Sequence, residues 1–283
     1  MTSRGRELAG FTLLRIAALF VLLILVIILG DIIIKGMGAI SWGFLTTAPT
    51  NGMTEGGILP AIIGTFFVTL ITAVLAVPLG IFAAIYLNEY AVKTKMTRLI
   101  RLSIRNLAGV PSIVFGLFGV ALFVRLFGFG TSLLAAGMTL GLLTLPVIIT
   151  ASEEALKTVP NSYRDGSLAL GATKWQAIKT NVLPSAIPGI LTGVILGLAR
   201  AAGETAPILF TGVAFYLPFL PDSVYSQFMA LPYHLYIMAT QHHAIEQVRP
   251  LAYGTALVLI ILVFSMNLIA VILRSYFRRK AVR

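Results

Sequence analysis

Two oppositely charged residues, Arg200 and Glu204, lie inside one long apolar segment of the chain. They are four residues apart, so a helix places them on the same face. A charge at the centre of a bilayer costs roughly 2.5–3.5 kcal/mol on insertion scales, and such residues usually face a cavity or a partner. An Arg guanidinium suits an oxyanion such as phosphate, with Glu204 holding Arg200 when no anion is present. The pair therefore predicts either a solute pathway or a structural ion pair within one helix.

The other residue types that commonly carry chemistry predict no reaction. The sequence has no cysteine and no phosphate-binding loop of the GxxxxGKS/T type, so energy for any transport must come from elsewhere. His234, His242 and His243 fall in an expected outer loop, and we interpret them as exposed surface residues rather than metal ligands. Glu153 and Glu154 are adjacent, so on a helix they point in different directions and form no acid–base pair. We expect no catalytic residue, no cofactor and no metal.

The composition indicates that most of the chain lies in a membrane. Of its 283 residues, 58% are hydrophobic and only 11% are charged, with a mean hydropathy of +0.96. Glycine and proline interrupt most of the apolar runs, which favours a packed bundle and hence an all-α polytopic membrane protein. Runs long enough to cross about 30 Å of hydrocarbon predict six spans, at about residues 12–35, 59–88, 106–127, 131–152, 186–214 and 251–274.

The formal charge of +11 is unevenly distributed along the chain. All but four of the 21 Lys and Arg residues lie in the two tails, between the second and third spans, or between the fourth and fifth; the exceptions are Lys35, Arg125, Arg200 and Arg249. Positive charge concentrates on the cytoplasmic side of membrane proteins, so both termini are expected there, as six spans require. This distribution accounts for the basic charge without nucleic acid as a partner.

A polar stretch of about thirty residues, from Glu153 to Pro184, separates the fourth span from the fifth. A membrane protein that keeps a structured helical pair in water usually offers it to a soluble partner. The first half carries Leu168, Ala169 and Leu170, a small apolar knob that suits a groove on another protein. The alternative is a hairpin that only packs against its own bundle.

Capping signals within this stretch predict a helix, a glycine corner and a second helix. Ser162 and Asp165 resemble a capping box that opens the first helix, and Gly171 ends it. Thr173 and Gln176 form a second capping-box pattern. The predicted helices cover about 163–170 and 174–182, and they are followed by Pro184 and a return to the membrane.

Three glycines of the fifth span, Gly189, Gly193 and Gly197, repeat every four residues. Such a stripe of small residues lets another helix approach closely. The approaching helix can belong to this chain or to a second membrane subunit.

The polar stretch resembles the cytoplasmic loop of the type I ABC importer permeases, which serve binding-protein-dependent, ATP-driven importers. The motif of that family is Glu-Ala-Ala, three residues, Gly, nine residues, Ile, one residue and Leu-Pro. This chain has Asp165-Gly166-Ser167, then Gly171, then Asn181 in place of Ile, then Leu183-Pro184 at the same spacing. The resemblance implies a coupling helix that docks into an ATPase subunit, with the motif residues Asp165, Gly166, Ser167, Leu168, Gly171, Leu183 and Pro184 contributing.

Two further segments resemble phosphate-importer permeases of the PstA type. They are residues 200–211, RAAGETAPILFT, and residues 108–119, AGVPSIVFGLFG. The resemblance covers about 59–275 and implies a multi-pass permease for inorganic phosphate in a prokaryotic plasma (inner) membrane. The partners it implies are a sister permease in a heterodimer, two cytoplasmic ATPase subunits, an external phosphate-binding protein, phosphate and membrane lipid.

The expected organisation has three parts. Residues 1–58 hold the N-terminal tail, first span and outer loop; residues 59–275 form the permease core with a coupling loop at 153–185; residues 276–283 form a basic tail. Three alternatives remain open: a permease for another oxyanion such as sulfate or molybdate, an ion-driven secondary transporter or channel, and a membrane scaffold without a transport role. A secondary transporter predicts internal repeat symmetry, which is not evident. A scaffold leaves Arg200 and Glu204 unexplained.

Overall fold

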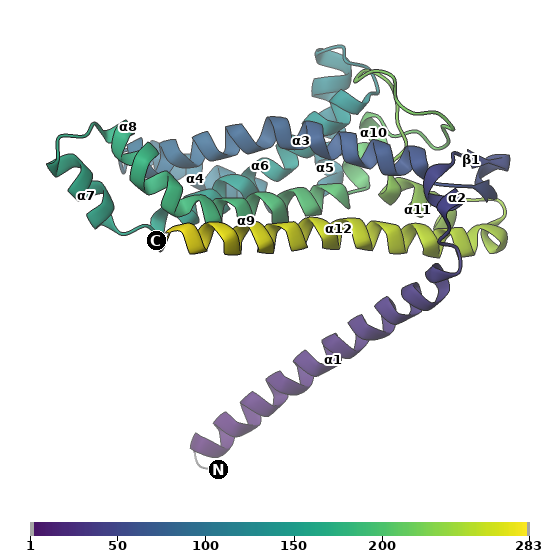
Figure 1. Cartoon of the computed structure of the whole chain (residues 1–283), viewed down its shortest axis with the longest axis horizontal. Coiled ribbons are helices and arrows are strands. Elements are labelled where there is room, and N and C mark those ends of the chain that lie inside the picture. The colour runs from purple at the N-terminus through teal and green to yellow at the C-terminus, as the bar shows by residue number, and fades with distance from the viewer. Residues whose placement is uncertain (1–2, 282–283) are drawn as a thin grey trace.

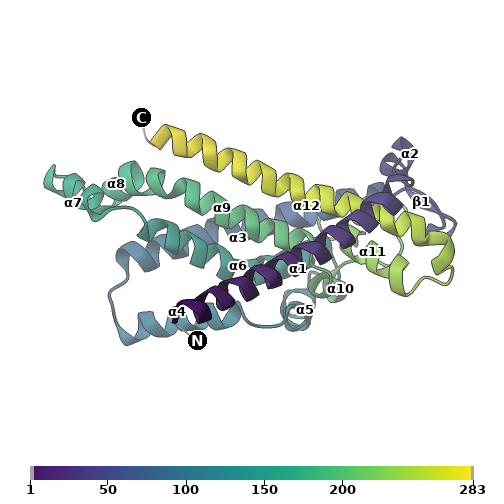
Figure 2. The same cartoon turned by 90° about the horizontal axis from the view of Figure 1, so that it is seen from below.

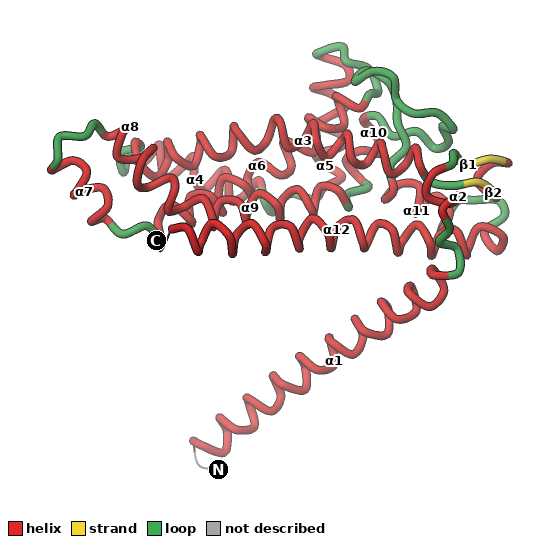
Figure 3. The backbone as a smooth tube through the Cα atoms, viewed as in Figure 1, coloured by secondary structure: helices red, strands yellow, loops and turns green. Residues whose placement is uncertain are grey.

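A computed structural model describes the backbone of residues 3–281 and the side chains of residues 10–276. Residues 1–2 and 282–283, which belong to the two expected tails, lie outside the described residues. Figure 3 shows a helical chain with one small hairpin at one end. The α-helices are α1 (Ser3–Met37), α2 (Trp42–Thr46), α3 (Leu59–Ile85), α4 (Lys95–Leu107), α5 (Ser112–Gly119), α6 (Leu133–Lys157), α7 (Asn161–Ala169), α8 (Lys174–Ala177), α9 (Leu183–Ala202), α10 (Ala206–Thr211), α11 (Leu231–Thr240) and α12 (Ile245–Ala281). The remaining elements are the 3-10 turn η1 (Asn51–Met53), the π-helical segments η2 (Tyr86–Tyr90), η3 (Val120–Leu126) and η4 (Ile178–Val182), and the strands β1 (Pro49–Thr50) and β2 (Glu55–Gly56).

The centre of the molecule is a bundle of the long helices α3, α6, α9 and α12, which run along its longest axis (Figure 1). α6 packs against both α3 and α9, and α12 packs against α9. Glycines allow these close approaches. A Cβ added to Gly80 of α3 would lie 2.5 Å from Ile148 of α6, and one added to Gly189 of α9 would lie 2.7 Å from the Cβ of Ala155.

The glycine stripe of the fifth span faces α6 of the same chain. A Cβ on Gly193 would overlap the methyl group of Ala151, so the two helices are in direct contact there. Gly197 is less crowded, since its added Cβ would lie 3.5 Å from Ile148. The structure therefore uses the stripe for packing within the chain.

Replacing Gly193 by Ala should destabilise the fold, because the new methyl group meets Ala151 across the contact of α6 with α9. Overpacking of this kind costs about 1–3 kcal/mol. Gly197→Ala is the matched control, since its methyl group makes ordinary contacts and Ala favours a helix by about 1 kcal/mol over Gly. Thermal unfolding in detergent should give a lower midpoint for Gly193→Ala and an unchanged or higher one for Gly197→Ala. Equal midpoints for the two variants would contradict the tight contact.

Among the described residues, five helices are long and apolar enough to cross a membrane, or six if one bent pair counts as a single span. This agrees with the expected all-α polytopic class. The five candidates are α1, α3 with η2, α6, the continuous stretch through α8, η4 and α9, and α12. The bent pair is α4 with α5 and η3.

The expected third span, 106–127, is not one continuous helix. α4 and the helix formed by α5 and η3 meet at 102°. Figure 2 shows α5 nearly end-on, while α4 lies along the edge of the bundle. Pro111 accounts for the break, because it has no N–H to donate and it disfavours helical geometry at Val110. Most of the segment 93–105, expected as a loop, instead belongs to α4.

The fifth span also differs from the prediction at both ends. One helical stretch runs from Lys174 to Ala202, so Pro184 does not end the second helix of the polar stretch. The π-helical turn η4 ends at Val182, and Pro184 lies in the first turn of α9, where a proline is tolerated. At the far end the helix stops at Ala202 and resumes as α10 after a break at residues 203–205.

α1 diverges from the bundle. Its C-terminal end packs on α12, where Gly36 lies against the backbone of Tyr253, and the rest of the helix points away (Figures 1 and 2). Its most apolar window of 18 residues is 0% buried. A helix that is apolar on all sides needs lipid or another membrane subunit around it.

The structure shows that two of the three histidines interpreted as surface residues are buried. His234 lies in α11, which packs against α3 and α12, and it is 2% exposed. His242 follows α11 and is 4% exposed. Of the three histidines, only His243 is exposed. The backbone N–H of Ala244 donates to Nδ1 of His242, which leaves Nε2 as the donor to the carbonyl of Gly52, 2.7 Å away. Burial lowers the pKa of His234 to about 4, so it is neutral at pH 7. His242 therefore joins η1, the turn between β1 and β2, to the segment between α11 and α12.

Candidate functional site

A helical hairpin made of α7 and α8 projects from one end of the bundle, the end at which α12 also finishes (Figure 1). α7 begins directly after Pro160, which makes no side-chain capping hydrogen bond. The predicted capping box of Ser162 and Asp165 is therefore wrong. The chain is already helical at Asn161, so Ser162 lies inside the first turn and cannot be the N-cap residue.

The glycine corner and the second capping box are confirmed. Gly171 has a φ of +83°, and the N–H of Ala172 donates to the carbonyl of Ser167 at 3.1 Å, which ends α7 in a Schellman motif. Thr173 Oγ1 accepts from the backbone N–H of Gln176 at 3.3 Å, and the Gln176 side chain accepts from the backbone N–H of Thr173 at 2.7 Å. Local capping chemistry thus fixes the angle between the two helices.

α7 and its C-terminal corner expose apolar side chains, although Leu168 and Asp165 also line a pocket between the hairpin and the bundle. Leu170 is 91% exposed at the tip and Leu168 is 48% exposed, with Tyr163 on the same short helix also exposed. Asp165 is exposed, and a Cβ on Gly166 would meet nothing within 4 Å. These residues have the accessibility that docking to a second protein requires.

Two positions at which the chain departs from the family motif contact each other. Ser167 stands where the motif has Ala, and Asn181 stands where it has Ile. Asn181 Nδ2 donates to Ser167 Oγ at 2.6 Å, and that hydroxyl donates to the carbonyl of Tyr163 at 2.7 Å. A polar pair therefore joins α7 to η4. The last motif residues begin α9, where Leu183 packs against the core and Pro184 is exposed.

A double-mutant cycle should measure this contact. Ser167→Ala and Asn181→Ile should each loosen the hairpin, because each removes the hydrogen bond, whereas the double variant brings together the apolar types of the motif. The coupling energy should be about 0.5–1.5 kcal/mol. Hydrogen exchange of the amides of residues 161–182 is the measurement. Strictly additive effects of the two substitutions would contradict a direct contact.

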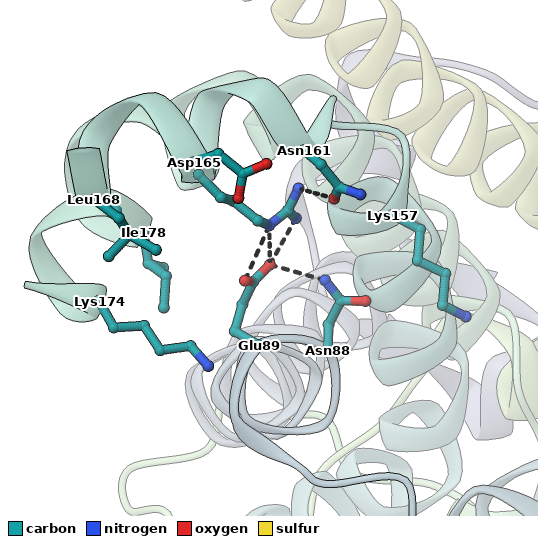
Figure 4. Close-up of a pocket in the computed structure, with 10 residues that line it drawn as sticks. Asn88, Glu89, Lys157, Asn161, Asp165, Leu168, Lys174 and Ile178 are labelled. Atoms are coloured by element: carbon teal, nitrogen blue, oxygen red, sulfur yellow. Dashed lines mark hydrogen bonds and ion pairs between the residues drawn. The ribbon is translucent and has the colours of Figure 1, made fainter.

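A buried ion pair between Arg164 of α7 and Glu89 of η2 anchors the hairpin to α3. Nη2 of Arg164 lies 2.7 Å from one Glu89 carboxylate oxygen and Nε lies 3.1 Å from the other. The same guanidinium donates to the carbonyls of Leu156 and Val159, at 3.0 and 2.8 Å. Figure 4 shows Glu89 beneath α7, with Asn88 donating to the same carboxylate at 2.8 Å. The Glu89 side chain is 5% exposed, so loss of either partner would leave a buried charge.

Sequence reasoning missed this ion pair because its partners are 75 residues apart and no spacing rule links them. A weaker contact supports it, with Lys174 Nζ 5.0 Å from the centre of the Tyr90 ring. Both contacts tie the α7–α8 hairpin to η2, which continues α3. The hairpin is therefore held by the bundle at its base and is free at its tip.

Glu153, the first residue of the polar stretch, lies within α6 and is 7% exposed. It pairs with Arg101 of α4 at 3.1 Å and with Lys157 at 3.2 Å. Arg101 also donates to the carbonyl of Leu87 at 2.7 Å. This cluster attaches α4 to the same ends of α3 and α6 that hold the hairpin.

Arg200 and Glu204 form the expected ion pair, with 3.3 Å between Nε and Oε1. The prediction that one helix carries both is wrong, because α9 ends at Ala202 and Glu204 lies in the break before α10. Pro207 favours this break, since it could not donate to the carbonyl of Gly203 in a continuous helix. The Arg200 side chain is 57% exposed, and in the described structure its two Nη atoms make no hydrogen bond. One edge of the guanidinium is therefore open.

The chain belongs to the family described as binding-protein-dependent transport system inner membrane component, which matches residues 76–283. It is therefore a permease subunit of the ABC-transporter class. Among solved structures, it is similar to a bacterial transporter that imports alginate, with a TM-score of 0.68, 14% identity and coverage of 97% of this chain and 99% of the other. It is also similar to the MetNI methionine transporter in an inward-facing conformation, with a TM-score of 0.60, 19% identity and coverage of 78% and 94%. Both likenesses concern the fold.

The sequence relatives are more similar to this chain than the solved structures are, with identities of 35–40%. The chain is 36% identical to the phosphate transport system permease protein PstA of Mycobacterium leprae over 93% of this chain and 86% of the relative. It is 40% identical to PstA 1 of Mycobacterium tuberculosis over 80% of this chain and 73% of the relative. A probable ABC transporter permease of Bacillus subtilis, YqgI, is 35% identical over 90% of both chains.

Proposed function

We propose that this chain is the permease subunit of an ATP-driven, binding-protein-dependent importer of inorganic phosphate in a prokaryotic plasma (inner) membrane. The observation that carries the proposal is the 36% identity with a phosphate transport system permease across 93% of the chain. An exposed Arg at a break in a membrane helix is consistent with an oxyanion as substrate.

In this proposal the α7 end of the bundle faces the cytoplasm, because the Lys and Arg residues gather in the segments at that end. The exposed tip of α7 docks into an ATPase subunit, one of two in the complex. The chain has no nucleotide-binding loop of the GxxxxGKS/T type. The energy of ATP hydrolysis must therefore be transmitted to it through such a contact.

The opposite end then receives phosphate from an external binding protein. The apolar surface of α1, which this chain leaves uncovered, supports a heterodimer with a sister permease within the lipid. When ATP closes the ATPase subunits, movement of α7 is transmitted to α9. The bundle switches between inward-facing and outward-facing states around a passage that contains Arg200.

Replacing Arg200 by Ala should lower phosphate uptake by about tenfold or more, because a charge-assisted hydrogen bond to the anion is lost. Uptake of labelled phosphate by cells without another phosphate uptake system is the measurement, at matched expression. Arg125→Ala, a change at an exposed Arg in η3, is the control and should transport normally. Normal uptake by Arg200→Ala would remove Arg200 from the pathway. Uptake of sulfate or molybdate in place of phosphate by the unaltered complex would contradict the substrate.

Replacing Leu170 by Asp should weaken binding of the ATPase subunits, because a charge would replace the most exposed apolar side chain of α7. A central apolar contact is worth about 2 kcal/mol or more at an interface. Co-purification of the ATPase with the tagged permease is the measurement. Phe219→Asp, at an exposed residue between α10 and α11, should retain the ATPase. Full retention and full transport by Leu170→Asp would rule out docking at α7.

A further inference from the structure

A cationic groove of about 880 Å³ lies between α4 and the ends of α3 and α6. It is separate from the Arg200 pair. It borders the base of the α7–α8 hairpin, because Asn88 lines both this groove and the pocket between the hairpin and the bundle. Its charged lining is entirely basic and consists of Lys93, Lys95, Arg98, Arg101, Arg105 and Lys157.

The charge of this groove is largely uncompensated. Arg101 and Lys157 pair with Glu153. The other four cations have no carboxylate partner among the described residues, and the sequence contains no Asp or Glu between Tyr90 and Ser152. Several Arg and Lys donors that converge on one concavity suit an anion with several oxygens, above all a phosphate group.

α4 adds an apolar surface beside the cations. No residue of α4 is buried. On its helical wheel the cations Lys95, Arg98 and Arg105 fall on one side, and the exposed apolar residues Met96, Ile100 and Leu107 fall on the opposite side. Two further exposed apolar residues, Leu99 and Leu102, lie next to the cations, and Leu102 lines the groove itself. A free inorganic anion would use only the first side, whereas a phospholipid would use both.

We propose that this groove holds the phosphate group of an anionic phospholipid from the cytoplasmic leaflet, with acyl chains along the apolar side of α4. The assignment rests on the orientation given under the proposed function. Each Lys or Arg near an anionic membrane surface strengthens binding by about fivefold, so the four unpaired cations favour an anionic lipid strongly over a zwitterionic one. The bound headgroup lies next to the base of the α7–α8 hairpin.

Native mass spectrometry of the full-length permease in detergent tests the proposal, with phosphatidylglycerol and phosphatidylcholine added in equal amounts. Phosphatidylglycerol should bind preferentially to the unaltered chain. Arg98→Gln with Arg105→Gln should weaken its binding by about 30-fold, because two groove cations are lost. Arg125→Gln with Lys179→Gln removes the same charge from exposed sites outside the groove and should bind as the unaltered chain does.

Equal binding of the two lipids by the unaltered chain would overturn the proposal without any variant. Equal loss in both double variants would also overturn it, because the groove would then not be the site. Labelled inorganic phosphate supplies a further arm. If it binds the unaltered chain, displaces phosphatidylglycerol and fails to bind Arg98→Gln with Arg105→Gln, the ligand is free phosphate rather than lipid. None of these results depends on uptake, so they are independent of the Arg200 test.

Discussion

The close contact of α6 with α3 and α9 supports everything else in this structure. The contact depends on the absence of side chains at Gly80, Gly189 and Gly193. The α7–α8 hairpin follows α6, and its second helix continues into α9. Its ion-pair partner Glu89 lies in η2, which continues α3. One uninterrupted helical stretch then leads from Lys174 to Ala202 and carries Arg200 near its end. The coupling proposed above therefore has a continuous helical element between the hairpin and the charged pair.

The sequence predicted the features that depend on neighbouring residues. The predictions failed where contacts between distant residues determine the structure. Apolar length located the membrane helices, and the Gly171 corner and the Thr173 capping box followed from neighbouring residues. The two prolines Pro111 and Pro184 carry the same local signal, yet one breaks a helix and the other does not. Helices of this chain also continue through Pro78, Pro146 and Pro188, so the residue type alone does not distinguish a proline that breaks a helix from one that is tolerated. The Glu89–Arg164 pair was likewise invisible, since it arises only when α3 and α7 are brought together.

The hairpin keeps the spacing of the family motif although two of its residue types differ. The chain has Ser167 and Asn181 where the motif has apolar residues, and read separately both look like losses. In the structure they form one hydrogen bond between facing helices. The spacing from Gly171 to Leu183 is kept, so the motif preserves the geometry of the corner while the chemistry that closes it has changed.

Both side chains that hold α7 come from π-helical turns, Glu89 from η2 and Asn181 from η4. A π turn contains one residue more than an α turn, and such turns often occur at functional positions. Deleting a single residue from either turn would restore α geometry and leave the rest of the helix in nearly the same orientation, because the π turn holds one residue in excess. The side chain that contacts α7 would shift, since it lies within the turn itself. The hold on the hairpin thus depends on chain length as well as on residue type. A deletion of one residue at either of these helix ends would weaken that hold without altering the exposed surface of the hairpin.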